Sequence, residues 1–541
     1  MKKFLILVCF AFVTKSYSQE LSKDYVVYSV NKQIEEFPYC NDNSKPINAF
    51  ITYSQILANG KMGQLRELSS YRIKALMSKS GTSDKAVSQK EKESILKRTI
   101  YDVQIYKDSV AGIVLNYTDS LYTVWYFSYE YGKWLNAGED LGGKSIKEAR
   151  NKFIKKAPRF LKIINRINDM EAVSKDTTAF ANYLEKNGKP PKEYVIDALV
   201  SHKLVIYGEI HSRKVSWDLM KSVINSPEFS KCVSTIFLEL SDNSQEDLDR
   251  FFTNKYKDPE IILNILRNEE LFGWCDKGIY EFILDMWDLN NRLPRDKKIK
   301  VILTDVARPF KFLTTNTKED YLNFINKMPD RDEYMANKIE TYFKSSSDKR
   351  NYLFIVGDGH AYKSSAQKPF GDPKMILRST GSILSEKLPE GSVFTICTHR
   401  PIISNNGGVY GLVRKGLFDY IFAQSGNRPV AFNLNNSPFG KEPFDASYEM
   451  CYDINTGSFQ ECYDGYVFLQ PVKDEPSEYY LPELYSDGFI AEMKRRALIV
   501  GKEDINLYGI KIKDIVRDQF MENMKKYYEG YKRWDSMVSN D

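Results

Sequence analysis

The sequence predicts an α/β protein in which a mostly parallel sheet carries helices on both faces and is preceded by a small α+β domain. Two observations support this prediction. In the later part of the chain, helical patterns separate four short and almost wholly apolar segments, KLVIYGEIH, STIFLELS, KIKVILTDV and NYLFIVGDGH. Such segments are typical of parallel strands buried on both faces. The earlier part shows apolar–polar alternation with turn signals, which indicates antiparallel strands.

The first residues, MKKFLILVCFAFVTKSYSQE, have the pattern of a secretory signal peptide. Two lysines precede a short apolar core, and Ser16-Tyr17-Ser18 offers a small-x-small cleavage site. We therefore expect a signal peptide at 1–18, cleaved near Ser18, and an exported protein, periplasmic or secreted. The apolar core is too short to cross a bilayer, and no later segment is long and apolar enough, so we expect no transmembrane segment in the mature chain.

The charge of the chain excludes some classes of partner. The formal net charge of the 541 residues is +5. Removal of residues 1–18 deletes three lysines and no acids, which gives +5 − 3 = +2. No long basic block is present, so we expect neither nucleic acid nor an anionic membrane surface as a partner. A small molecule or a peptide is the expected substrate.

The cysteine pattern does not predict a structural zinc site. Seven cysteines are present, one of them in the predicted signal peptide, and no CxxC or paired Cys/His spacing occurs. Cys451 and Cys462 flank the turn-like segment DINTGS, and in an exported protein a disulfide between them would staple a hairpin. Buried thiols are an equally good interpretation.

Residues 19–174 are expected to form the accessory α+β domain. A helix is predicted near Ala49–Ser78 and a second, basic helix over Gly142–Ile167. Between them the strand signals are RTIYDVQIY, SVAGIVLNY, LYTVWYFSYEY and KWLNAGED. We find no catalytic constellation in this part of the chain.

Residues 175–475 are expected to form the α/β domain and residues 476–541 a helical extension. A helix is predicted over Thr177–Gly188, and the segment NGKPPKEY marks a turn before the first apolar strand. The extension contains two amphipathic helical patterns, SDGFIAEMKRRALIVG and DIVRDQFMENMKKYYEGYKRW. Packing against the core is the simplest role for them.

Polar side chains follow each of the four apolar segments at the point where the strand is expected to end. Parallel strands bring these ends to one edge of the sheet, where ligands bind in open α/β proteins. The sequence therefore predicts one site at that edge, built from the following residues: Glu209, His211, Glu239, Asp305, Arg308, Asp358 and His360.

Each of these residues also has a plain structural interpretation. A histidine after a strand is commonly a satisfied turn residue, Glu239 is equally suited to an ion pair, and Asp305 to capping a helix. The joint pattern is more specific. Two of the four histidines, His211 and His360, each have a glycine three positions before them and an acid two before. The other two are less telling, since His202 precedes a strand and His399, in VFTICTHR, ends another apolar segment.

A family resemblance becomes visible in these segments. GEIHSRKVSWDLMKSVI followed by STIFLEL resembles the opening of the erythromycin-esterase-like family, which belongs to a wider group with ChaN-like haem-binding proteins and Tiki/TraB-type proteases. DMWDLNNRLPRDKKIKVILTDV, RDEYMANKI and NYLFIVGDGHAYKS are similar to later family segments, and NRPVAFNL and YDGYVFLQP to its closing strands. The resemblance extends over roughly Pro190–Val472.

The resemblance implies an exported hydrolase that cleaves an ester or amide bond. Its functional set here would be Glu209, His211, Glu239 and His360. His211 would be the base that activates water, oriented by Glu209 or Glu239, because a histidine titrates near neutral pH. His360 and Arg308 would stabilise developing negative charge.

Two departures from the family pattern bear on the substrate. Ser212-Arg213 stands where the esterases often have Gly-Thr, and the interval between His211 and His360 is shorter than in full-length erythromycin esterases. The shorter interval implies a smaller lid over the site.

Two cofactor hypotheses remain open at this stage. His211, Glu239 and His360 form a candidate set for a divalent metal such as zinc, which the Tiki-type relatives require. The alternative function is a ChaN-like haem or iron-binding protein without hydrolytic activity, with Tyr362 and Met335 as further candidate iron ligands. A third hypothesis is a non-catalytic descendant whose N-terminal domain binds the ligand.

Overall fold

The computed structural model describes most of the chain, and the account below is restricted to that part: residues 24–61, 64–65, 68–70, 86–118, 120–130, 133–171, 177–313, 317–367, 376–403, 409–444, 457–475 and 480–530. The predicted signal peptide lies outside these residues, and so does Cys451 of the proposed disulfide. The predicted domain boundary at residue 174 also lies outside them. The domain boundaries at residues 174 and 475 both stay predictions.

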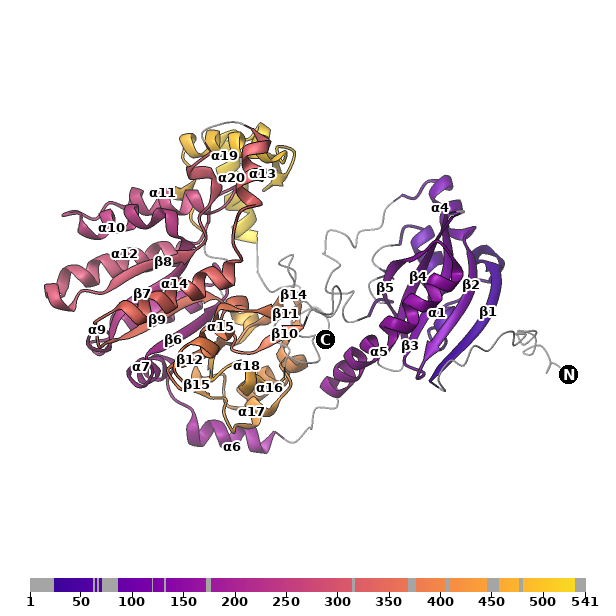
Figure 1. Ribbon diagram of the computed structural model, residues 1–541, viewed down its shortest axis with the longest axis horizontal. Coiled ribbons are helices and arrows are strands. Elements are labelled where there is room, and N and C mark those ends of the chain that lie inside the picture. Colours follow the sequence, from indigo (N-terminus) through magenta and orange to yellow (C-terminus); the bar gives the residue numbers. More distant parts are fainter. Residues whose placement is uncertain are drawn as a thin grey trace.

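The first part of the chain forms a five-stranded antiparallel sheet in which each strand pairs with the next along the chain (Figure 1). One face packs against α1 and the other against α5, each through its own apolar cluster. Short α4 precedes β2. The elements are β1 (Tyr25–Gln33), α1 (Pro46–Ala58), α4 (Gln89–Leu96), β2 (Thr99–Tyr106), β3 (Val110–Thr118), β4 (Leu121–Glu130), β5 (Lys133–Gly143) and α5 (Ile146–Glu171).

The helix predicted near Ala49–Ser78 is shorter than expected. Helix α1 ends at Ala58 because Gly60 adopts a left-handed conformation (φ 70°), a common way to stop a helix. Ser69, inside the predicted range, instead forms a bridge to Asn136 of β5. The strand β1 was not anticipated from the sequence; it pairs antiparallel with β2.

The second part of the chain is built on a seven-stranded sheet with the order β15-β16-β12-β6-β9-β7-β8. All neighbours run parallel except β15, which is antiparallel to β16. The predicted fold class is confirmed. The strands are β6 (Leu204–Glu209), β7 (Val233–Ser241), β8 (Lys300–Asp305), β9 (Asn351–Gly357), β12 (Val393–Thr398), β15 (Val430–Asn433) and β16 (Gly465–Phe468).

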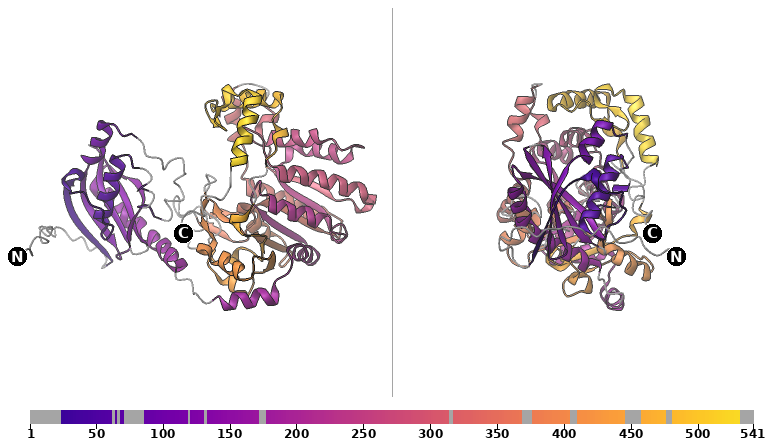
Figure 2. Two further views of the ribbon diagram at one scale, coloured as in Figure 1. Left: turned by 180° about the vertical axis from the view of Figure 1, so that it is seen from behind. Right: turned by 90° about the vertical axis from the view of Figure 1, so that its right-hand side faces the viewer.

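Helices cover both faces of this sheet, as Figures 1 and 2 show. Alternate residues of β6 point to opposite faces, so Val205 and Tyr207 join one apolar cluster while Leu204 and Ile206 join the other. The first cluster includes α7 (Pro191–Ser201), α8 (Lys214–Ile224), α9 (Phe229–Cys232), α10 (Gln245–Thr253), α11 (Pro259–Glu269) and α12 (Lys277–Arg292). The second includes α6 (Thr178–Asn187), α14 (Arg331–Ser345), α15 (Thr380–Lys387), α16 (Leu417–Gln424), α17 (Pro438–Lys441) and α18 (Phe459–Cys462).

The C-terminal helices α19 (Asp487–Val500) and α20 (Arg517–Gly530) belong to the first cluster, so they pack on the α/β core. Helix α13 (Lys318–Ile325) lies beside α19. Three two-stranded ribbons complete the fold: β10 (Ser365–Gln367) with β11 (Ile376–Arg378), β13 (Pro401–Ile403) with β14 (Val409–Leu412), and β17 (Asn506–Leu507) with β18 (Ile510–Lys511). In the described part of the chain, no helix has the length and apolar character needed to cross a membrane.

Candidate active site

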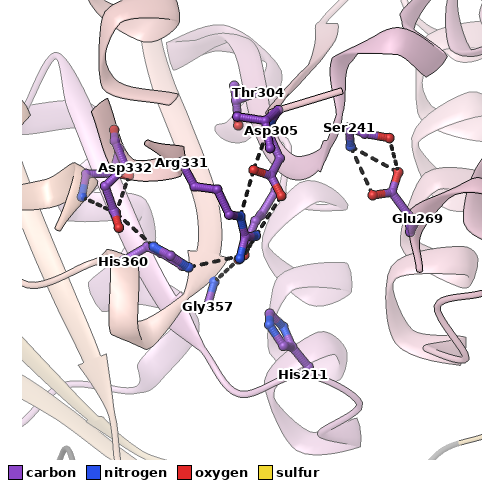
Figure 3. A network of polar contacts seen from close by, with 12 residues as sticks. His211, Ser241, Glu269, Thr304, Asp305, Arg331, Asp332, Gly357 and His360 are labelled. Carbon is purple, nitrogen blue, oxygen red and sulfur yellow. Dashed lines mark hydrogen bonds and ion pairs between the residues drawn. The ribbon is translucent and has the colours of Figure 1, made fainter. Parts of the chain in front are cut away.

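The carboxyl ends of β6, β7, β8 and β9 bring most of the predicted residues together at one edge of the sheet, and Figure 3 shows His211, Asp305 and His360 among them. Glu209, the last residue of β6, is level with Gly357 at the end of β9, and Ser241 of β7 is level with Asp305 of β8. The register of β7 shifts between Leu238 and Ser241, around Glu239. Because the strands are parallel, side chains from distant parts of the sequence meet here.

His211 is held by Glu209. Nδ1 of His211 lies 2.6 Å from Oε1 of Glu209, and Glu209 is buried whereas the His211 side chain is 44% exposed. Burial alone would lower the pKa of His211, but Glu209 and the nearby carboxylates of Glu239 and Asp276 raise it to about 9. The result is an accessible imidazole whose orientation is fixed by a buried carboxylate.

The segment after His211 is fixed by the start of helix α12. Asp276, the N-cap of α12, accepts hydrogen bonds from the backbone N–H groups of Gly278 and Ser212 (both 2.8 Å). Ser212 has a φ of 60°, in the left-handed region that side chains rarely adopt. The His211 ring also meets Trp274 edge-on, with ring centroids 4.7 Å apart. These contacts determine where the histidine lies.

Glu239 is the central carboxylate of the site. Oε2 accepts the N–H of Gly357 (2.6 Å), and Oε1 accepts from Nη2 of Arg331 (2.8 Å) and lies 3.5 Å from Nε2 of His360. Burial would raise the pKa of Glu239, but the surrounding cations and the Gly357 N–H lower it to about 2. Glu239 is therefore ionised and lies between two histidines.

Gly357 permits this close packing. A Cβ at position 357 would lie 2.9 Å from Cε1 of His211 and 3.0 Å from Oε2 of Glu239, both too close for an ordinary contact. The glycine three positions before His360, which the sequence pattern singled out, is thus required by the approach of two site residues.

His360 forms a second histidine–carboxylate pair, with Asp332. Its Nδ1 lies 2.8 Å from Oδ1 of Asp332, which also accepts from the N–H (2.6 Å) and the hydroxyl (2.8 Å) of Thr380. Burial alone would lower the pKa of His360, but Glu239 and Asp332 raise it. Asp332 is at the start of α14 and Thr380 begins α15, so two helix N-termini fix this ring.

The cation that faces the site is Arg331 rather than Arg308. Arg331 donates from Nε and Nη2 to Asp305 (3.0 and 2.6 Å) and from Nη2 to Glu239, and its side chain is 36% exposed. Arg308 is buried, donates to Asp305 (2.8 Å) and has Nε 3.7 Å from Glu269. The predicted contact of Arg308 with the site is therefore indirect, through Asp305.

Glu269 adds a buried acid behind Arg308. It accepts hydrogen bonds from the backbone N–H and the hydroxyl of Ser241, the hydroxyl at 2.7 Å. Burial raises the pKa of Glu269 to about 7. No sequence pattern marks Glu269 as a site residue, because a glutamate at the end of a helix is common.

Asp358, the remaining predicted residue, lies outside this network, and so do the two histidines that were not predicted to belong to it. Asp358 pairs with buried Arg400, which follows β12. His399 is buried, with Nδ1 2.8 Å from the Tyr466 hydroxyl. His202 ends helix α7, at the opposite edge of the sheet, with Nδ1 3.1 Å from the carbonyl oxygen of Ala198.

The donors of the site do not fit the predicted metal. In the parts of the chain that the structure describes, no group of three or more His, Cys, Asp and Glu side chains is arranged to hold a metal ion. Both oxygens of Glu239 are engaged, by Gly357 and Arg331, and the Arg331 guanidinium stands where a cation between Glu239 and Asp305 would be.

The predicted haem ligands do not fit either. Met335 and Tyr362 are buried in the apolar cluster of α6 and α14–α18. Both ring nitrogens of His360 face carboxylates. The residues of the site therefore fit neither the metal nor the haem.

Comparisons with known proteins give a remote likeness in fold. No protein-family model matches the sequence, and no curated protein matches it. The chain is similar to a solved structure of a Bacillus cereus protein (14% identity, TM-score 0.40, 55% of this chain and 98% of that one). It is also similar to a mutant of the erythromycin esterase EreC in its open conformation (11%, 0.34, 51% and 92%) and to ChaN of Campylobacter jejuni, which binds haem cofacially (15%, 0.24, 39% and 87%). At these identities and TM-scores the likeness carries no conclusion about the family or the activity of this chain.

Proposed function

We propose that the protein is a hydrolase that cleaves an ester or amide bond with water activated at His211. The observation that carries the proposal is the pair of buried Glu209 and accessible His211 at the carboxyl edge of a parallel sheet. A carboxylate that holds one ring nitrogen fixes the tautomer and leaves the other nitrogen to take the proton from water. The same arrangement supports the base in unrelated hydrolases.

The chemistry follows from the charges around the ring. Neutral His211 takes a proton from water through Nε2 while Glu209 stabilises the imidazolium that forms. The hydroxide equivalent attacks the carbonyl carbon, and the imidazolium then returns the proton to the leaving group. Because the pKa of His211 is raised to about 9, the neutral base becomes more abundant as the pH rises toward that value. His360, with its raised pKa, supplies positive charge on the other side of Glu239 for the tetrahedral oxyanion.

The proposal is tested by hydrolysis of a panel of aryl esters and anilides in water labelled with heavy oxygen. The wild type is expected to place the label in the acid product. Glu209→Gln leaves the shape of the site but weakens the support of His211, so turnover should fall by about 10- to 100-fold.

Glu193→Gln is the matched control, because Glu193 is exposed on α7. It should retain wild-type turnover. The absence of any labelled product from the whole panel, with wild-type protein that is folded, would rule the proposal out.

A further inference from the structure

We infer that the substrate of this site carries an oxyanion group, a carboxylate, phosphate or sulfate, that is recognised by Arg331. The inference rests on the proposed function, because it names the class of substrate that the hydrolase takes. Some charged side chains of the site face solvent, whereas others already have partners within the protein, and this difference is the basis of the inference.

The charges are arranged in two layers. His211 and Arg331 are 44% and 36% exposed at the side chain, and His360 is 21% exposed. Beneath them, Glu209 and Glu239 are 5% exposed and Asp305 is fully buried. The cationic side chains of the network are therefore more exposed than the carboxylates directly beneath them.

The carboxylates of the site have hydrogen-bond or ion-pair partners within the protein. Most of these carboxylates accept a backbone N–H: Glu239 from Gly357, Asp305 from Val306, Asp276 from Ser212, Asp332 from Thr380 and Glu269 from Ser241, whereas Glu209 contacts His211. Helices that follow parallel strands begin at this edge, so their N-terminal dipoles add positive potential there.

Arg331 is prepared to bind a further acceptor. It is the first residue of α14, and Asp305 fixes its guanidinium through Nε and Nη2. Its hydrogen bonds to the described residues use only those two nitrogens, so Nη1 retains two N–H donors without an acceptor in that part of the chain. A guanidinium held rigid in this way recognises carboxylate and phosphate well, because little side-chain entropy is lost on binding.

Two acids near this face would repel an anionic ligand. Asp332 is 20% exposed, but its Oδ1 is already engaged by His360 and by both donors of Thr380. Glu270 is 59% exposed, and its Oε1 lies 3.4 Å from Nη2 of Arg308. Neither contacts Arg331 through Nη1.

The first test measures anion binding without turnover. The four histidines give a small set of ring resonances in protein labelled only at histidine. Inorganic phosphate, sulfate and acetate should each shift the His211 and His360 resonances with saturation and leave His202, at the other edge, unchanged. Arg331→Gln should weaken this binding by at least about tenfold and Arg331→Lys by less, since lysine keeps the charge but not the fork of donors.

The controls separate a loss of binding from a loss of fold. Arg295→Gln removes an exposed arginine from the segment before β8, at the amino edge, and should bind like the wild type. If Arg331→Gln fails to fold, Arg331→Met replaces it as the neutral variant, and wild-type binding in both Arg331→Lys and Arg331→Met would overturn the inference. The absence of saturable shifts in the wild type would also overturn it.

The second test compares esters that carry a free carboxylate or phosphate with the same esters after methylation of that group. The wild type should prefer the charged ester by about tenfold or more in kcat/KM, and Arg331→Gln should lose the preference. Equal kcat/KM values for the charged and the methylated ester would overturn the inference about Arg331 but leave the proposed hydrolase function intact. If the protein binds the anions but cleaves no ester, the anion site at Arg331 is supported and the proposed hydrolase function is wrong.

Discussion

His202 and His211 flank the same strand, β6, at opposite edges of the sheet. His202 ends a helix, contacts the carbonyl oxygen of Ala198 and packs against Phe394 in a tilted arrangement, with ring centroids 4.4 Å apart. His211 contacts a buried glutamate and has a second glutamate and an aspartate close enough to raise its pKa to about 9. Two residues of one type, nine positions apart, thus have very different electrostatic surroundings.

The difference comes from the direction of the strands. A cavity of about 530 Å³ lies at the amino edge and includes His202 and Phe394 in its lining, yet His202 has no carboxylate among its hydrogen-bond partners in the described residues. At the carboxyl edge the chain leaves each strand toward a helix, and acids and cations from four strands converge. Here the topology, rather than the size of a cavity, brings the charged side chains together.

The largest expected effect separates the two histidines directly. His211→Gln should reduce turnover by about 10²- to 10⁴-fold, the usual contribution of a general base. His202→Gln should remain within about twofold of the wild type, as surface changes do. Initial rates on whichever ester the wild type cleaves give both values, and equal losses in the two variants would break the comparison.

A second pair of variants tests the close packing at Gly357. Gly357→Ala places a Cβ within 3.1 Å of two His211 atoms and Oε2 of Glu239, so the ring must move and turnover should fall by about 10²-fold. Gly359→Ala, two residues further on, meets nothing within 4 Å and should change turnover by less than about twofold. A Gly357→Ala protein with normal rates would show that the position of the ring does not matter.

A smaller effect concerns the stability of the carboxyl edge. Burial raises the pKa of Glu269 from 4.5 to about 7, so its proton is lost in the unfolded state at a lower pH than in the folded state. The wild type should therefore lose stability as the pH rises from 4.5 to about 7, by at most ~1.4 kcal/mol per pKa unit.

Glu269→Gln removes this titration, so its stability relative to the wild type should increase over the same range. Urea unfolding near pH 5 and near pH 8 measures the change. A constant difference between the two proteins would contradict a buried, titrating Glu269.

The sequence predicted the sheet and the strand-end residues because both follow from local pattern. Apolar segments identified β6, β7, β8 and β9, and the polar residue after each marked the edge. Glu209, His211, Glu239, Asp305 and His360 do come together there.

The rest of the site could not be found in this way. Arg331 and Asp332 begin a helix, and nothing in a single sequence says that this helix start lies against a strand end as far as 92 residues away, at Glu239. The segment RDEYMANKI was noted for its resemblance, yet its first two residues were not assigned roles. Arg308 follows a strand end as predicted, but it is oriented toward Glu269 because Arg331 occupies the outer side of Asp305.

In the proposed mechanism His211 is the general base and Glu209 orients its ring and stabilises the imidazolium. The most direct measurement follows the His211 ring resonance with pH and compares its pKa with the pH dependence of kcat/KM. The ring pKa should lie near 9. The rate should rise with pH to a plateau, with its midpoint at the ring pKa, and both should shift together to lower pH in Glu209→Gln. A rate profile that stays in place while the ring pKa moves would show that His211 is not the base.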